Sequence, residues 1–489
     1  MACGTILKNM KDRMFRVKEL PSYESLEKTG LAKVLGVVDL LSLGIGSTIG
    51  VGIYVIAGQV ARLYCGPSIF ISFLIAGIAS LLAGMCYAEF AARVPRAGSA
   101  YVYSYVTVGE FMAFIIGWTL VLEHAIGSAA ITRAGSAYID SVTGNKMSQF
   151  FRTYMPIDIS IFASYPDLFA FSIDFVLTLL LIIGVKESSR FNCIFTSINI
   201  SMVLFTIGFF LSKADIKNWQ TETKDIPKSA HAGTGGFFPY GVDGMLTGAA
   251  VTFYTYVGFD TVATAGEETK NPKRDIPLSI ILTITIVAVI YILMSMSLTL
   301  VTPYYKIDPV VSVPLIFDSM GWYIPKYFVY AGAFCGLATS LVGALFPLPR
   351  ILYAMGLDDV LFPFFATISE RFKTPAIATL IGGTLTGLIA TMFSVEELIS
   401  MYSIGTLQSY ALVSVCVIIL RYRQQNTDGK LENEQFHLKY LFMPVSDKPT
   451  AVTEKIVKIV ITLMCMYKII VLYTSNTKQI YSIFISTYI

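Results

Sequence analysis

The sequence predicts an all-α integral membrane protein with about eleven transmembrane helices. Of its 489 residues, 55% are hydrophobic and 14% are charged, whereas a soluble globular protein carries about 25% charged residues. The mean hydropathy is +0.66. Apolar runs long enough to cross a hydrocarbon core of about 30 Å recur along the chain. Lipid must therefore be the solvent for much of the surface, because too few polar residues are present to face water everywhere.

The apolar runs give the expected helices in chain order. Each contains enough consecutive apolar residues to span a bilayer. The predicted spans lie near residues 36–59, 68–91, 111–138, 168–185, 192–213, 243–266, 278–302, 327–350, 374–393, 397–420 and 456–474.

Lysine and arginine give the predicted orientation. With the N-terminus in the cytosol, the inner segments hold 22 of these residues and the outer segments hold 10. Cytoplasmic loops of membrane proteins carry an excess of positive charge. We therefore expect a multi-pass protein with a cytosolic N-terminus, and the plasma membrane is its expected location.

Composition argues against several other classes. The formal charge of +3 is too small to indicate a nucleic-acid partner. The seven cysteines share no zinc-type or CxxC spacing and are expected to be packing residues. The three histidines form no HExxH motif, no GxSxG motif is present, and repeated pore-lining rings are absent from the sequence. We expect no enzyme activity, no metal and no cofactor.

The first span contains the glycine-rich stretch GIGSTIGVGIY, with glycines at 44, 46, 50 and 52. Glycine costs a helix roughly 1 kcal/mol relative to alanine, so this stretch is a weak point. Gly46 and Gly50 also fit a small-xxx-small pattern, which would serve close helix packing. The stretch alone leaves both interpretations open.

The sixth span favours a break. It places Gly258 at mid-span and Asp260 two residues later. A charged side chain at mid-bilayer costs about 2.5–3.5 kcal/mol and usually lines a site or a water path. Two interrupted helices, five spans apart, indicate an inverted-repeat transporter.

A pair of broken helices suits a zwitterionic ligand. Each break frees backbone N–H groups at one new end and C=O groups at the other. The N–H end can hold a carboxylate and the C=O end an ammonium. Ser47 and Thr48 add hydroxyls beside the first break. An α-amino acid carries one group of each sign, about one backbone unit apart.

The motifs at these positions resemble the cationic amino acid transporters of the amino acid–polyamine–organocation superfamily. The resemblance runs from about residue 30 to 425 and rests on GIGSTIGVGIY, AGMCYAEFAARVPRAGSAYVYSYVTVGE, GFFPYGVDGMLTGAA, YVGFD, GEETKNPKRDIP and FPLPRILYAM. It implies a LeuT-like core of two inverted five-helix repeats. The expected domains are a cytosolic segment over 1–33, a core over 34–421 (repeats 34–213 and 237–421), a cytosolic loop over 422–453, and a further helix with a short tail over 454–489.

The resemblance also implies a substrate site between the first, third, sixth and eighth spans. In the eighth span we expect Leu341 to Gly343 to face it. Ser47 contributes its hydroxyl, and the other expected site residues stand at the two breaks, at positions that match the substrate site of the family. Together they are Ser47, Thr48, Ile49, Gly50, Val51, Gly52, Tyr254, Thr255, Val257, Gly258 and Asp260.

Four further residues carry specific hypotheses. Glu123 of the third span, or Asp260, is expected to shape a negative potential for a cationic side chain, although a structural hydrogen bond is the alternative for Glu123. Glu89 is expected to serve transport or an inner-face ion pair. Tyr254 is either an aromatic gate or a packed aromatic residue. His124 is expected to face away from the pocket as an interior histidine, and the alternative is that it titrates within the third span beside Glu123.

The driving force is predicted from Asn199. Proton-coupled relatives carry a lysine in the fifth span, where this chain has Asn199. Asparagine cannot titrate, so we expect a uniporter driven by the membrane potential, working by alternating access on arginine, lysine or ornithine. The loop with Glu267 and Glu268 could latch the cytosolic side.

Several alternatives stay open. The chain could be an amino acid sensor, a broad neutral amino acid carrier, or a truncated inactive relative, because animal members usually have fourteen helices. Val51 stands where relatives tend to have a smaller or hydroxylated residue, which leaves pocket volume open. Residues 139–167 contain no cysteine, so no disulfide-linked heavy chain is expected. The amino acid substrate and the bilayer are the expected partners.

Overall fold

A computed structural model describes most of the chain. The described residues are 16–18, 31–157, 159, 162–227, 233–309, 311–422 and 451–474. Most of the predicted cytosolic segment 1–33, nearly all of the loop 422–453 and the tail beyond residue 474 lie outside them.

Helices cover every apolar run predicted from the sequence, and no named strand occurs in the described residues. An isolated bridge joins Leu35 to Thr269. The helices that carry the spans are α3 (Val37–Thr48) with α4 (Ala57–Val60), α5 (Ile69–Arg93), α7 (Glu110–Val142), α9 (Leu168–Ile183), α10 (Val185–Ser212), α11 (Gly241–Phe253) with α12 (Asp260–Thr264), α13 (Pro272–Val301), α15 (Tyr323–Leu345), α17 (Ala376–Met392), α18 (Val395–Tyr422) and α19 (Ala451–Thr474).

Shorter helices connect these elements. They are α6 (Ala100–Thr107), α8 (Lys146–Tyr154), α14 (Ser312–Ser319) and α16 (Pro347–Leu357). Among the described helices, five regions are long and apolar enough to cross a membrane, and three shorter apolar helices accompany them. The protein is therefore an all-helical membrane protein, while the number of spans and the inverted repeat stay predictions.

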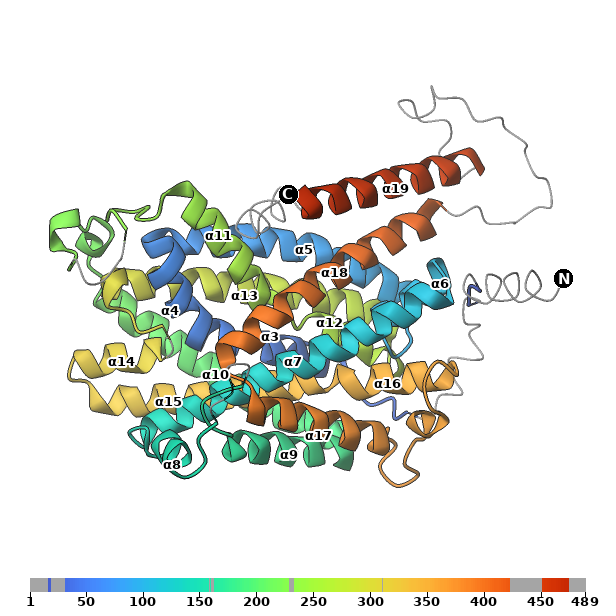
Figure 1. Ribbon diagram of the computed structural model, residues 1–489, viewed down its shortest axis with the longest axis horizontal. Coiled ribbons are helices and arrows are strands. Elements are labelled where there is room, and N and C mark those ends of the chain that lie inside the picture. Colours follow the sequence, from blue (N-terminus) through green and yellow to red (C-terminus); the bar gives the residue numbers. More distant parts are fainter. Residues whose placement is uncertain are drawn as a thin grey trace.

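The packing places the first span at the centre. In Figure 1, α3 lies within the bundle, and it contacts α10, α13 and α15. Around it, α5 packs along α13, α9 along α17, and α10 along α15. Each of these pairs joins one helix from the predicted first repeat to one from the second. The broken spans are thus held by neighbours from both halves of the chain.

The outer surface is rich in large apolar side chains. Leu122, Val176, Ile194 and Leu388 are each more than half exposed. A soluble protein rarely exposes so many, whereas lipid tails accept them. The opposite faces of the same helices bury serine, threonine and charged residues, so the polar groups gather in the interior.

Candidate functional site

The first span is broken where the glycine-rich stretch predicts it. Helix α3 ends at Thr48, and Ile49 has φ −83° and ψ 80°, which is not helical. The chain resumes as a π-helical turn over Gly52–Ile56. A π-helical turn within a helix often marks a functional site.

Both interpretations of the glycines hold, for different residues. A Cβ at Gly44 would lie 2.6 Å from the Thr283 hydroxyl, and one at Gly46 would lie 2.5 Å from the Thr196 hydroxyl. These two glycines stay helical and serve close packing. Gly50 lies at the break itself, where a Cβ would overlap the Ser340 hydroxyl.

The sixth span is broken at Val257 and Gly258. Helix α11 gives way to a 3-10 turn over Tyr254–Tyr256, and Val257 is extended with ψ 138°. Gly258 has φ +130°, a conformation that side-chain-bearing residues rarely adopt. Helix α12 then begins at Asp260, whose carboxylate Oδ1 accepts a hydrogen bond of 3.1 Å from the Gly258 N–H.

Side chains from distant segments bind the carbonyl groups that the first break exposes. The Ser340 hydroxyl donates to the Ser47 carbonyl over 3.1 Å, and the Tyr291 hydroxyl donates to the Thr48 carbonyl over 2.7 Å. Asn199 donates its amide to the Ile49 carbonyl over 2.8 Å. A buried unpaired carbonyl would be costly, so these three donors make the break a stable conformation.

The two breaks are also joined directly. The Ser47 hydroxyl donates to the Gly258 carbonyl over 2.9 Å, and the Tyr291 hydroxyl lies 2.9 Å from the Thr255 carbonyl. Tyr291 of α13 therefore touches both broken spans. Any movement of one break must be accommodated by the other.

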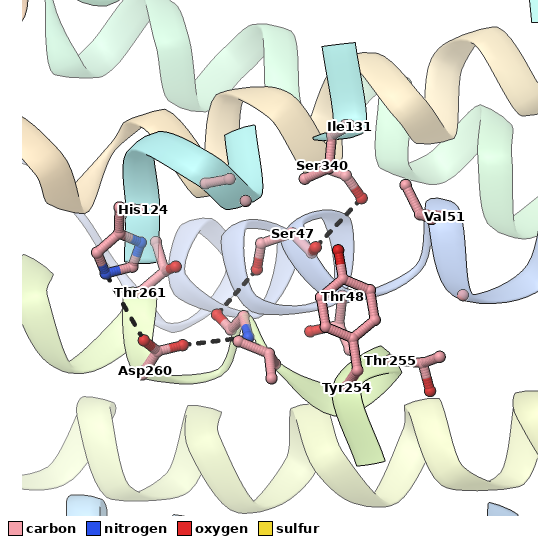
Figure 2. Close-up of a pocket in the computed structure, with 15 residues that line it drawn as sticks. Ser47, Thr48, Val51, His124, Ile131, Tyr254, Thr255, Asp260, Thr261 and Ser340 are labelled. Carbon is pink, nitrogen blue, oxygen red and sulfur yellow. Dashed lines mark hydrogen bonds and ion pairs between the residues drawn. The ribbon is translucent and has the colours of Figure 1, made fainter. Parts of the chain in front are cut away.

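A cavity lies between the breaks (Figure 2). Its volume is about 40 Å³, counted as the space open to the centre of a water-sized sphere. A buried water needs about 10–15 Å³ when the volume is counted in this way. The cavity can hold a few waters but must widen to admit an amino acid with a long side chain. Its lining is Ser47, Thr48, Val51, Gly52, His124, Gly127, Ile131, Tyr254, Thr255, Val257, Gly258, Asp260, Thr261, Ser340 and Ala344.

Most of the residues proposed from the sequence lie in this lining. Ile49 and Gly50 lie at the break but outside the lining. Glu123 also lies outside it; this residue is 2% exposed, and its Oε2 accepts a hydrogen bond of 3.1 Å from the Ser409 hydroxyl of α18. The members that line the cavity are Ser47, Thr48, Val51, Gly52, Tyr254, Thr255, Val257, Gly258 and Asp260.

The orientation expected for His124 is wrong. His124 lines the cavity, with Nε2 3.9 Å from Asp260 Oδ2. The sequence did carry a signal for this face, because polar residues recur every four positions along α7 and so share one side of the helix. All of them are buried, and they are His124, Ser128, Thr132, Ser136 and Asp140. The adjacency of Glu123 and His124 was a second signal, because neighbouring residues point to different sides of a helix.

The eighth span also differs from expectation. Ser340 and Ala344 of α15 line the cavity, and Leu341 to Gly343 do not. Gly343 instead packs against the first span, because a Cβ there would overlap the Ser47 side chain. Its carbonyl accepts a hydrogen bond of 3.1 Å from the Thr261 hydroxyl. The predicted helix is right, but the residues that face the cavity are the two that flank the predicted stretch; they are four positions apart and therefore lie on one side of the helix.

Asn199 and Glu89 lie away from the cavity. Asn199 is fully buried and accepts a hydrogen bond of 2.7 Å from the Tyr54 hydroxyl. Glu89, at the end of α5, pairs with Arg93 at 2.8 Å and with Arg421 of α18, whose Nε lies 2.9 Å from Glu89 Oε1. The predicted ion pair at Glu89 is therefore present, with Arg421 as a partner that the sequence did not indicate.

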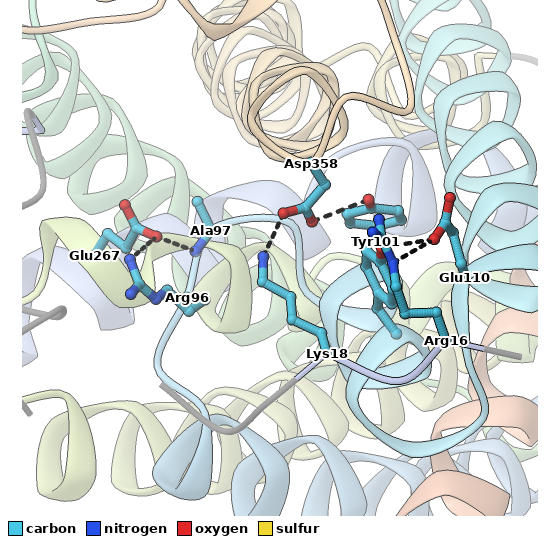
Figure 3. Close-up of polar contacts among 9 residues, drawn as sticks. Arg16, Lys18, Arg96, Ala97, Tyr101, Glu110, Glu267 and Asp358 are labelled. Atoms are coloured by element: carbon cyan, nitrogen blue, oxygen red, sulfur yellow. Dashed lines mark hydrogen bonds and ion pairs between the residues drawn. The ribbon is translucent and has the colours of Figure 1, made fainter. Parts of the chain in front are cut away.

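Charged residues form a network at the same end of the bundle (Figure 3). Glu267 lies 3.6 Å from Arg96 and accepts a hydrogen bond of 3.2 Å from the Ala97 N–H. Residue Lys18 reaches Asp358, after α16, at 2.5 Å. These contacts join four segments that are far apart in the sequence, two by two.

A deeper ion pair lies beside this network. Glu268 and Arg350 are each 1% exposed, and their charged groups are 3.0 Å apart. The Arg350 guanidinium also stands over the Phe346 ring at 3.7 Å. The segment that follows the sixth break is thus tied to α16 by a fully buried pair.

Comparisons with known proteins identify a matching family and several relatives. Residues 35–489 match the amino acid permease family. The chain is 39% identical over 407 residues to a Mus musculus protein named cationic amino acid transporter 4, covering 83% of this chain and 62% of that protein. It is 38% identical over 417 residues to an Arabidopsis thaliana protein named cationic amino acid transporter 4, vacuolar, covering 84% and 67%. A second Arabidopsis protein, named cationic amino acid transporter 3, mitochondrial, is 37% identical over 399 residues, covering 80% and 63%.

Proposed function

Because the chain belongs to the amino acid permease family and is similar to cationic amino acid transporters, we propose that it carries amino acids across a membrane by alternating access, with cationic L-amino acids favoured. The chain spans about 62% of the length of the mouse relative. The proposal therefore concerns the part of the protein that contains both helix breaks.

The observation that carries the proposal is the cavity between the two breaks. The N–H groups at the start of a helical segment have no partner within that segment, and they favour a negative group. We expect the segment that begins after Gly50 to receive the substrate carboxylate. The substrate ammonium is then directed toward the carbonyl groups around Val257.

Asp260 supplies the selectivity for a cationic side chain. It is the carboxylate in the cavity lining and is 3% exposed. A buried charge is stabilised by an opposite charge at short range, which a lysine or arginine side chain provides. Glu123 adds negative potential from behind the lining, where the Ser409 hydroxyl holds its carboxylate in place.

The membrane potential supplies the driving force in this proposal. A monovalent cation entering a cell at about −60 mV gains roughly 1.4 kcal/mol, from about 2.3 kcal/mol per 100 mV. That energy corresponds to about tenfold accumulation. Asn199 supports a uniporter, because its amide binds the Ile49 carbonyl and carries no exchangeable charge.

The proposed orientation of the protein in the membrane rests on the distribution of positive charge along the chain. The excess of lysine and arginine in the predicted inner segments supports a cytosolic N-terminus. The plasma membrane is our proposal, although the names of two relatives include a vacuole and a mitochondrion. Imaging of a tagged chain against markers for these three membranes decides among them.

Uptake of labelled arginine tests the proposed function. We expect saturable uptake that is inhibited by lysine and ornithine more strongly than by neutral amino acids, at a clamped voltage. The variant Glu123→Gln should reduce arginine uptake more than uptake of a neutral amino acid. Binding without any flux would instead identify a sensor, and equal losses for both substrates would remove the role of Glu123 in recognition.

A further inference from the structure

His124 and Asp260 face each other across one end of the cavity. They are the imidazole and the carboxylate of its lining, and they are 4% and 3% exposed. The two come from different elements, α7 and α12, and lie at the same end of the group of lining residues (Figure 2). Figure 2 shows the imidazole pointing toward the carboxylate.

The two oxygens of Asp260 have different surroundings. Oδ1 accepts the hydrogen bond from the Gly258 N–H at the helix break. Oδ2 lies 3.9 Å from His124 Nε2, which is longer than a hydrogen bond of about 2.7–3.2 Å. One oxygen is therefore fixed by the backbone, and the other is available to a second cationic partner from the cavity.

The charge of this pair depends on one proton. With a neutral imidazole the pair carries a charge of −1, and with a protonated imidazole it is neutral. The carboxylate and ammonium of an amino acid cancel, so a cationic substrate adds +1 and a neutral substrate adds nothing. A cationic side chain thus matches the unprotonated pair, and a neutral side chain matches the protonated pair.

We propose that His124 determines specificity, because its proton and the cationic side chain of the substrate compete for Asp260. This inference rests on the proposed function and deepens it. In acid, a cationic side chain enters after the imidazole proton has left to water on the side from which the substrate came. The pair takes a proton back from that same side after it returns empty, so the substrate still carries its charge across the membrane. No bond other than that N–H is broken, and the charge of the occupied cavity is the same in both states.

Neighbouring groups leave His124 as the base that can fill this role. No lysine or arginine lines the cavity, so within the described residues none competes for Asp260 there. The other titratable or charged groups near the pair come from each surrounding element. They are Tyr254 beside the sixth break, Tyr87 of α5 within electrostatic reach of Asp260, and Glu123 of α7 bound to Ser409 of α18. The buried guanidinium groups of Arg133 and Arg350 are each paired with another carboxylate, Asp167 and Glu268.

Other cavity elements contribute only hydroxyl groups near the pair. The Ser47 hydroxyl donates to the Gly258 carbonyl and that of Ser340 to the Ser47 carbonyl, while the Thr48 hydroxyl donates to the Gly44 carbonyl, one turn earlier in α3. Histidine is the side chain whose charge ordinarily changes between pH 5 and 8. The pair should therefore respond to the pH range that membranes experience.

The test compares the pH dependence of two substrates in the full chain, reconstituted in liposomes at a fixed potential. For labelled arginine, KM is expected to rise as pH falls from 8.0 to 5.5, by up to about tenfold for each pH unit once the imidazole is protonated. For labelled leucine, KM should stay level or fall. The variants His124→Gln and Asp260→Asn should each remove the difference between the two profiles.

The outcomes separate this inference from the proposed function. No uptake of any amino acid at any pH would contradict the proposed function. Saturable arginine uptake with the same KM at pH 5.5 and 8.0 would overturn the inference alone, and so would a pH dependence that His124→Gln retains. If His124→Gln does not fold, His124→Asn takes its place, and a ratio of arginine KM to leucine KM that still rises in acid in that variant would overturn the inference, because the competing proton would then lie on another group.

Discussion

The amide nitrogen of Asn199 lies 2.8 Å from the carbonyl oxygen of Ile49. The fifth span thus holds the break in the first span through a neutral side chain. The oxygen of the Asn199 amide accepts a hydrogen bond from the hydroxyl of Tyr54, which lies four residues after Gly50. Both sides of the break are therefore attached to one residue of α10, which fixes the distance between the two halves of the span.

Replacing Asn199 by aspartate should damage the break. A carboxylate cannot donate to the Ile49 carbonyl, so the bond is lost and two acceptors face each other. The expected cost is about 1–3 kcal/mol, as for a buried polar group left unsatisfied. Thermal unfolding in detergent measures it. Ser201→Ala, on the exposed side of α10, is the control, and equal stability of the two variants would remove the role given to Asn199.

Replacing Gly258 by alanine should straighten or destabilise the sixth span. Its φ of +130° is strained for alanine, and the added Cβ would lie 2.8 Å from the Ser47 hydroxyl and 2.9 Å from the Thr48 hydroxyl. We expect a loss of about 1–3 kcal/mol together with loss of uptake. Gly208→Ala in α10 is the matched control, since nothing lies within 4 Å of its Cβ position. A Gly258→Ala variant that unfolds and transports like Gly208→Ala would contradict the break.

Breaking the Arg350–Glu268 pair should cost more than breaking the pair between Arg421 and Glu89. The first pair is 1% exposed on both sides, and removal of one partner of a buried pair costs about 3–5 kcal/mol. Arg421 is 59% exposed, and surface pairs contribute about 0–1 kcal/mol. The melting temperatures of Arg350→Met and Arg421→Met give the comparison. A larger decrease in melting temperature for Arg421→Met than for Arg350→Met would contradict the conclusion that the buried pair stabilises the fold more than the exposed pair does.

Two buried aspartates should respond in opposite ways to replacement by asparagine. Asp167 pairs with Arg133 at 3.3 Å, with both side chains nearly buried. Asp174 in α9 is 1% exposed and has no ion pair within the described part of the chain. Asp167→Asn leaves a buried guanidinium without its counter-ion and should destabilise the protein. Asp174→Asn removes a buried ionisable group and should leave the melting temperature unchanged or raised; a large loss at Asp174 alone would indicate an unrecognised cationic partner.

The helices and their breaks could be predicted from the sequence because each follows from a strong local signal. Membrane spans need long apolar runs, and these runs coincide with the helices. A glycine-rich stretch and a mid-span aspartate marked the two breaks at Ile49 and Gly258. Such signals depend on a few neighbouring residues, so they can be recognised without knowledge of the tertiary contacts.

The contacts at the site could not be predicted in the same way. Tyr291 and Ser340 bind the carbonyls of the first break from positions 243 and 293 residues away in the chain. The spacing of four between His124, Ser128 and Thr132 could have indicated the buried face of α7. The approach of His124 to Asp260, however, depends on how α7 packs against the sixth span. The two wrong predictions, at His124 and at Leu341 to Gly343, both concern which side of a helix faces the cavity.

The most direct test of the account is potential-driven uptake by the purified chain in liposomes. With an inside-negative potassium diffusion potential of about 60 mV, labelled arginine should accumulate about tenfold, and the accumulation should be lost in Gly258→Ala and kept in Gly208→Ala. Arginine uptake that ignored the potential but collapsed when a pH gradient was removed would contradict the uniporter, and no saturable uptake at all would contradict the proposal that the two breaks hold an amino acid.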